Sequence, residues 1–140
     1  MKAPVRVYGH LGELLQGRMG QGGPVALITL PSPALFLELL SADTAEHFLS
    51  TEQVKAVQQH CGRTEPAPFR LRTAMPIGAG AGASTAALLA IYRAFSPAPS
   101  LDDFSRMALA LEGASDPLHV PEPERVLWAS REGRVLAHLP

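Results

Sequence analysis

Three alternating glycines stand directly before a pair of hydroxyl residues in the stretch MPIGAGAGASTAALLAIYRAF: Gly78, Gly80 and Gly82 precede Ser84 and Thr85. Glycine adopts backbone angles and permits close approaches that a Cβ forbids. The hydroxyl pair lies where we expect the chain to enter a helix. The first N–H groups of a helix have no partner within it and attract anions. The stretch therefore predicts a loop whose backbone holds the phosphates of ATP.

We predict that the nucleotide contacts come from the whole loop and the start of the helix, namely Pro76, Gly78, Ala79, Gly80, Ala81, Gly82, Ala83, Ser84 and Thr85. The loop is not a P-loop, because no Gly-Lys-Ser/Thr follows it. Its third glycine comes too early for a dinucleotide-binding fingerprint. The alternative interpretation is a flexible Gly/Ala turn before a core helix. A membrane span is disfavoured, because the uncharged residues 73–92 include glycines, hydroxyl residues and a proline.

Glu13 and His10 stand in a glycine-rich segment that follows an expected strand. A carboxylate there suits contact with a substrate or nucleotide, and the imidazole can assist it, so we predict both as substrate-binding residues. The alternative for Glu13 is an exposed loop charge, and a lone histidine is more often structural or solvated. His119 and His138 have no partners at helical spacing and indicate no zinc site.

Hydrophobic periodicity and turn residues predict the elements that must position these residues. The expected strands are 3–9, 24–31, 35–40, 69–75, 125–130 and 134–139, and the expected helices are 50–62, 83–95 and 100–113. Ser50 or Thr51 can cap the first helix and Gly62 can end it. Ser100 and Asp103 form a loose capping box at the third. The last two strands suit a hairpin, and the order of elements predicts a single α+β domain over residues 1–140.

Composition excludes several classes of protein. The 140 residues carry a net charge of −1, with scattered basic residues, which gives no electrostatic case for binding nucleic acid. The single cysteine, Cys61, excludes an internal disulfide framework and fits a reducing cytoplasm. The N-terminus has no long apolar region, so we expect no signal peptide and no membrane association.

The glycine loop resembles the second motif of the GHMP kinases, the family that includes galactokinase, homoserine kinase and mevalonate kinase. That motif is roughly P-x-x-x-G-L-G-S-S-A, and Pro76, Gly80, Gly82 and Ser84 match it, while alanines replace the leucine and the first serine. The head of the chain, GHLGELLQGRMGQGGPVALITLPSP, resembles the start of the L-threonine kinase branch, which is linked to cobalamin assembly and propanediol utilisation. The matching residues there are Gly9, Gly12, Glu13, Leu14, Gln16, Gly17, Thr29 and Pro31. With EGASDP at 112–117, the resemblance covers most of the chain.

The resemblance implies the ribosomal protein S5 domain 2-like fold of GHMP N-terminal domains. It also implies phosphoryl transfer from ATP, with Mg²⁺, to a small hydroxyl-bearing molecule. Ser84 and Glu112 would hold the metal, since Mg²⁺ prefers oxygen ligands, and Asp116 would orient or deprotonate the attacking hydroxyl. The residues alone leave two alternatives open: Glu112 as a solvated charge at a helix end, and Asp116 as a turn residue before Pro117.

GHMP kinases are much longer than this chain, and their C-terminal domain supplies a further glycine-rich motif. We therefore expect residues 1–140 to form an N-terminal ATP-binding domain with the C-terminal domain absent. Two functions remain open: a small-molecule kinase, or a non-catalytic or truncated domain that binds nucleotide or a partner. Without a second domain, we expect an exposed apolar patch at Leu35–Leu40 or on the 125–139 hairpin. A homodimer or the missing C-terminal domain would cover it.

Overall fold

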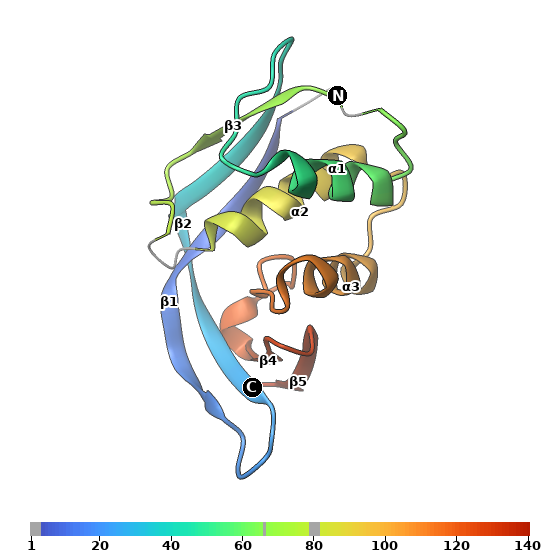
Figure 1. The fold of residues 1–140 in the computed structure, drawn as a ribbon. Helices are drawn as coiled ribbons and strands as arrows, with labels where there is room; N and C mark the ends of the chain where they lie inside the picture. The colour runs from blue at the N-terminus through green and yellow to red at the C-terminus, as the bar shows by residue number, and fades with distance from the viewer. Residues whose placement is uncertain (1–3, 66, 79–81) are drawn as a thin grey trace.

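An antiparallel sheet with three helices on one face forms the architecture of this computed structural model, which describes residues 4–65, 67–78 and 82–140 (Figure 1). The strands are β1 (Val5–Arg18), β2 (Val25–Ser41), β3 (Phe69–Thr73), β4 (Val126–Ala129) and β5 (Arg134–His138). The helices are α1 (Thr51–His60), α2 (Ala83–Phe95) and α3 (Leu101–Glu112), followed by a short 3₁₀ helix, η1 (Pro123–Arg125). The predicted α+β class is confirmed.

Strand β2 is the centre of the sheet. One of its edges pairs with β1, while the other pairs with β3 at residues 37–41 and with β4 at residues 26–27. The prediction of two separate strands in this region was wrong, because β2 runs through the prolines without a break. Pro33 falls where the register with β1 shifts between Tyr8 and Gly9, and a bulge there needs no ladder hydrogen bond from its nitrogen.

Strand β1 is also longer than the alternation of its side chains predicted. We expected it to end at Gly9 and to lead into a glycine-rich loop, but it continues to Arg18 as one arm of a long hairpin with β2. The register shifts again between His10 and Glu13, where Gly12 has φ +127°. The glycine signal marks a bulge in a strand rather than a loop.

Helix α2 lies in the middle of the hydrophobic core. Every residue from Thr85 to Tyr92 is buried, as the apolar sequence predicted. Three of these positions are alanines, and their small side chains let the helix backbone approach the sheet closely. The helix packs against a core from β1, β2, β3, α1 and α3 that includes Val7, Leu37, Leu39, Val57, Phe69 and Phe104. The position of α2 against the sheet is therefore fixed on several sides.

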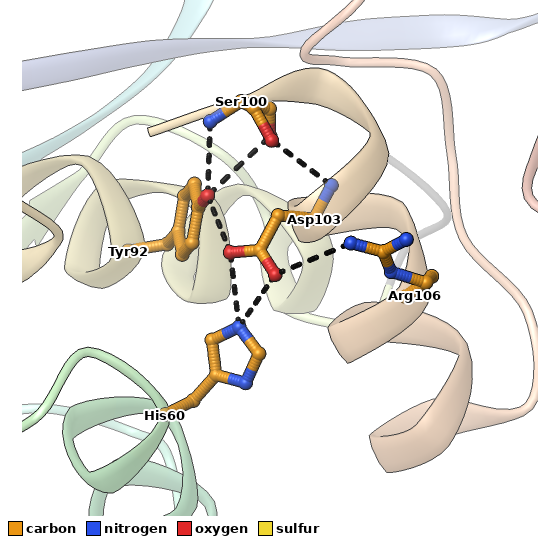
Figure 2. Close-up of polar contacts among 5 residues, drawn as sticks. All are labelled: His60, Tyr92, Ser100, Asp103 and Arg106. Atoms are coloured by element: carbon orange, nitrogen blue, oxygen red, sulfur yellow. Dashed lines mark hydrogen bonds and ion pairs between the residues drawn. The ribbon is translucent and has the colours of Figure 1, made fainter. Parts of the chain in front are cut away.

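The predicted capping of α1 and α3 is confirmed in detail. Ser50 and Gln53 form a complete capping box at α1, and Gly62 follows the helix with φ +88°. At α3 the Ser100 side chain accepts a hydrogen bond from the backbone N–H of Asp103. The second bond of the box, from the Ser100 N–H to the Asp103 side chain, is made through another residue. The N–H of Ser100 donates to the Tyr92 hydroxyl, which donates to Asp103 Oδ2 at 2.8 Å (Figure 2). A tyrosine of α2 thus closes the capping box of α3.

Asp103 also ties α1 to this network. His60, the last residue of α1, lies 3.0 Å from its carboxylate, and Arg106 lies 3.8 Å away (Figure 2). Hydrogen bonds from Tyr92 and His60 hold the pKa of Asp103 below its usual range. The apolar face predicted for α3 is correct for Phe104 and Met107, but Leu101 and Leu111 are exposed at its two ends.

A second, smaller core lies under β4 and β5. Trp128 is buried there with Leu27 and Val126, as predicted for a core tryptophan, and its indole N–H donates to the Ser115 carbonyl at 2.7 Å. His119 stacks edge-on between Phe104 and Trp128 and thereby links the two cores. Its Nε2 lies 2.8 Å from the Ser105 hydroxyl, and burial lowers the pKa of His119 to about 4.

The exposed apolar side chains are not where we expected them. Leu37 and Leu39 are fully buried by the helices, and β4 faces its own core. A group of exposed apolar side chains instead lies along the second half of β1 and directly after it: Leu11, Leu14, Leu15 and Met19. The prediction failed because Leu35–Leu40 proved to be the core part of the long β2. In the described part of the chain, no helix is long and apolar enough to cross a membrane.

Replacing Tyr92 by phenylalanine removes the hydroxyl that joins Ser100 to Asp103. The Ser100 N–H loses its acceptor, while Asp103 loses one donor and keeps His60 and Arg106. We expect Tyr92→Phe to lower the free energy of unfolding by about 1–2 kcal/mol. Tyr8→Phe, on the exposed face of β1, serves as the control and should change it by less than about 0.5 kcal/mol. Urea denaturation of both variants measures the difference, and equal stabilities would show that the network contributes nothing.

His119 should make stability fall with acid. Its pKa is depressed in the folded protein, so between the unfolded pKa of about 6.5 and the folded value the unfolded chain binds the extra proton. We expect a loss of about 2 kcal/mol between pH 7 and pH 5 from this group. In His119→Gln the free energy of unfolding should fall less between pH 7 and pH 5, as measured by urea denaturation at each pH. Identical slopes in the two proteins would contradict this assignment.

Candidate functional site

A cavity of about 730 Å³ opens at the N-terminal end of α2. Its wall includes the middle of β1, the start of β2, the start of α2 and the segment from the end of α3 to residue 116. Residues within 48–53, 77–78 and 130–131 contribute the rest of the described lining. Nearly all the described site residues that the sequence predicted line it, namely His10, Glu13, Gly78, Gly82, Ala83, Ser84, Thr85, Glu112 and Asp116. Residues far apart in the sequence therefore meet in one place.

Two groups of predicted residues stand apart from this wall. Pro76 is exposed and does not line the cavity, so its assignment as a nucleotide contact stays a prediction. The neighbouring Met75 takes the buried position at the end of β3, which leaves the proline ring facing solvent. Ala79, Gly80 and Ala81 lie outside the described residues.

The start of α2 has the form that anion binding requires. Gly82 is the N-cap residue, with φ +81°, and no side chain in the described part of the chain caps the helix there. The first N–H groups of α2 therefore remain available at the cavity wall. A Cβ on Gly82 would lie 3.0–3.1 Å from the His10 ring, so glycine is required both by φ and by the close approach of this imidazole.

Ser84 and Glu112 come together at this helix end. The Ser84 hydroxyl donates to Glu112 Oε1 at 2.7 Å. Glu112 is the last residue of α3, where a carboxylate is unfavourable for its own helix. Here it lies against the N-terminal end of α2, where negative charge is favourable. Glu112 is exposed, so the bond to Ser84 adds a partner to the charge at the helix end, and both interpretations of this residue stay open.

His10, Glu13 and Asp116 form a second cluster in the same cavity. The His10 ring is 2% exposed, its Nδ1 lies 3.3 Å from the Gly12 carbonyl, and its Nε2 lies 3.5 Å from Asp116 Oδ2. The contact with Asp116 raises the pKa of His10. Nε2 nevertheless has no hydrogen-bond partner among the described residues. Glu13 Oε1 lies 4.0 Å from Nδ1.

Arg131 is the residue that the sequence gave no reason to select. It follows β4 in the turn of the terminal hairpin and is the one Lys or Arg among the described residues of the wall. Glu13, Glu112 and Asp116 oppose it with three carboxylates. A single exposed arginine in a turn carries no local signal of function, and only the pairing of β4 with β2 brings it here.

The chain matches no known family model, and no curated protein sequence matches it. The resemblance to GHMP kinases therefore rests on the sequence motifs alone.

The contact between Gly82 and His10 predicts unequal costs for two glycine substitutions. Gly78 and Gly82 have nearly the same φ, +79° and +81°, but nothing lies within 4 Å of a Cβ on Gly78. Gly78→Ala should cost about 1 kcal/mol for its backbone angle alone. Gly82→Ala should cost about 1–3 kcal/mol more, because the added methyl crowds the buried imidazole. If urea denaturation gives the two variants equal losses in the free energy of unfolding, the His10 ring moves aside without cost and this prediction is wrong.

Proposed function

We propose that this protein is an ATP-dependent kinase domain that phosphorylates a hydroxyl group of a small molecule, most like an L-threonine kinase of the GHMP family. We also propose that its α+β fold is the S5 domain 2-like fold of that family. The observation that carries the proposal is the Ser84–Glu112 hydrogen bond at the N-terminus of α2, beside the cavity of about 730 Å³. The matching glycine and Glu13 motifs line the same cavity.

Phosphoryl transfer requires positioning and charge neutralisation more than covalent chemistry. The N–H groups at the start of α2 would accept the phosphate oxygens, as helix N-termini do. Three carboxylates face one arginine in the wall, so a triphosphate needs a cation to enter. The Ser84 hydroxyl and the Glu112 carboxylate are the hard oxygen donors that Mg²⁺ prefers, and these residues would hold it. When bound, Mg²⁺ would neutralise charge on the phosphates.

Asp116 would serve the acceptor. Its carboxylate is partly exposed in the cavity and lies 3.5 Å from His10 Nε2. An ionised carboxylate can orient or deprotonate a hydroxyl. Glu13 and His10 would bind the acceptor beside it. The location that we propose for the protein is a reducing cytoplasm.

A second function class has one observation in its favour. The exposed row Leu11, Leu14, Leu15 and Met19, on β1 and directly after it, is a surface that a further domain or a second copy would cover. The alternative is therefore a non-catalytic domain of the same fold that binds nucleotide or a partner.

Calorimetric titration of the 140-residue chain with ATP, in the presence and absence of Mg²⁺, tests the proposed function. We expect saturable binding that strengthens with Mg²⁺. Ser84→Ala and Glu112→Gln should each weaken Mg·ATP binding about tenfold, the loss typical of one charge-assisted contact. Neither should change the free energy of unfolding by more than about 1 kcal/mol, because both side chains are at the surface of the cavity.

Glu132→Gln, in the exposed turn of the terminal hairpin, is the matched control and should bind Mg·ATP as the wild type does. Saturable binding without phosphorylation of L-threonine or homoserine would favour the non-catalytic alternative. Absence of binding at millimolar Mg·ATP, or full binding by Ser84→Ala and Glu112→Gln together, would contradict the proposed phosphate site.

A further inference from the structure

His10 faces Asp116 in an unusual way. Its Nε2 is buried and has no hydrogen-bond partner among the described residues, although a carboxylate oxygen lies 3.5 Å away. When Nδ1 donates its proton to the Gly12 carbonyl, Nε2 presents a lone pair to the carboxylate, so two acceptors face each other. A buried polar atom without a partner is costly. A ligand that both atoms bind would satisfy them.

A simple ion pair would draw the two groups closer. Charge-assisted N–H···O bonds are about 2.7–2.9 Å long, and the pair His60–Asp103 in this protein lies at 3.0 Å. Two ligand atoms that each lie about 2.0–2.1 Å from one zinc ion, at a tetrahedral angle, are about 3.4 Å apart. The 3.5 Å between Nε2 of His10 and Asp116 Oδ2 agrees with shared coordination better than with a hydrogen bond.

The bulge in β1 supplies a third ligand. Residues i and i+3 of a regular strand point to opposite faces of the sheet. Between His10 and Glu13, β1 advances three residues while β2 advances two, from Pro31 to Thr29. This extra residue turns Glu13 to the side of His10. One ligand atom from each of His10, Glu13 and Asp116 lies within 4.8 Å of the others.

We infer that His10, Glu13 and Asp116 form a binding site for a divalent transition-metal ion such as Zn²⁺. One imidazole nitrogen and two carboxylate oxygens make a donor set that suits Zn²⁺, Mn²⁺ or Co²⁺. Mg²⁺ prefers oxygen ligands alone and is the better match for Ser84 and Glu112. The Gly12 carbonyl at Nδ1 would orient the ring, as backbone carbonyls commonly do for metal-bound histidines.

This site is separate in its chemistry from the proposed phosphate site and does not depend on it. A metal ion on Asp116 would bind the carboxylate lone pair that would otherwise accept the hydroxyl proton of the acceptor. The metal ion, rather than Asp116, would then position the acceptor.

Titration of the 140-residue chain with Zn²⁺, without nucleotide, tests the inference. We expect one ion per chain, and Co²⁺ at the same site should give the intense visible absorption of a four-coordinate complex. His10→Asn and Asp116→Asn should each raise the Kd at least about tenfold. Glu13→Gln, at a partly exposed position that folding tolerates, should raise it as well. The matched control is His138→Asn, an exposed histidine on β5, which should leave the Kd unchanged.

Several results would overturn the inference: no Zn²⁺ binding at millimolar concentration, an unchanged Kd in Glu13→Gln and His10→Asn, or an equal loss in His138→Asn. Thermal melts of each variant identify those that fail to fold. If His10→Asn or Asp116→Asn does not fold, the Kd of Glu13→Gln for Zn²⁺ decides whether the inference holds. Ser84→Ala should leave Zn²⁺ binding unchanged while it weakens Mg·ATP binding. Failure of the metal site and failure of the phosphate site are therefore distinguishable.

Discussion

The close packing of α2 against the sheet is the constraint on which the rest of the structure depends. Alanines along the helix let its backbone approach β1 and β2, and the larger side chains of the same helix, such as Leu88, Leu89 and Ile91, are fully buried. Tyr92, near the end of the helix, holds the start of α3 through Asp103. Because α2 cannot shift without opening this core, its N-terminus is held rigidly at the cavity, as a preorganised anion site requires.

The cavity is built where two helix ends of opposite polarity meet. The end of α3 carries Glu112, and the beginning of α2 presents unpaired N–H groups. Each end alone is electrostatically unsatisfied, and the Ser84–Glu112 bond joins them. The bulged part of β1 closes the other side and brings His10 against Gly82. A strand irregularity, a helix start and a helix end thus each contribute one wall.

Local signals predicted the local parts of this structure. The helix caps at Ser50 and Ser100, the buried face of β3 and the terminal hairpin all follow from a few neighbouring residues. The lengths of β1 and β2 did not, because their pairing overrides glycine and proline signals that would otherwise mark loops. Within the candidate site, the position of Ser84 at the start of α2 was predictable from its motif. The contact of His10 with Asp116 joins positions 106 residues apart, and Arg131 reaches the wall only through β4. Neither had a local signal.

Charge decides what such a cavity can hold. Glu13, Glu112 and Asp116 outweigh Arg131 in its described wall, so a phosphate enters only with cations, and a neutral acceptor alone gains little from the N-terminus of α2. The donor atoms are not equivalent, since Ser84 and Glu112 offer oxygen only and the opposite cluster adds the imidazole of His10. Ligand type selects among divalent ions more than affinity does. Under the proposed function, two cations of different character would therefore bind on the two sides of one cavity, with the phosphate at the helix end and the acceptor beside Asp116.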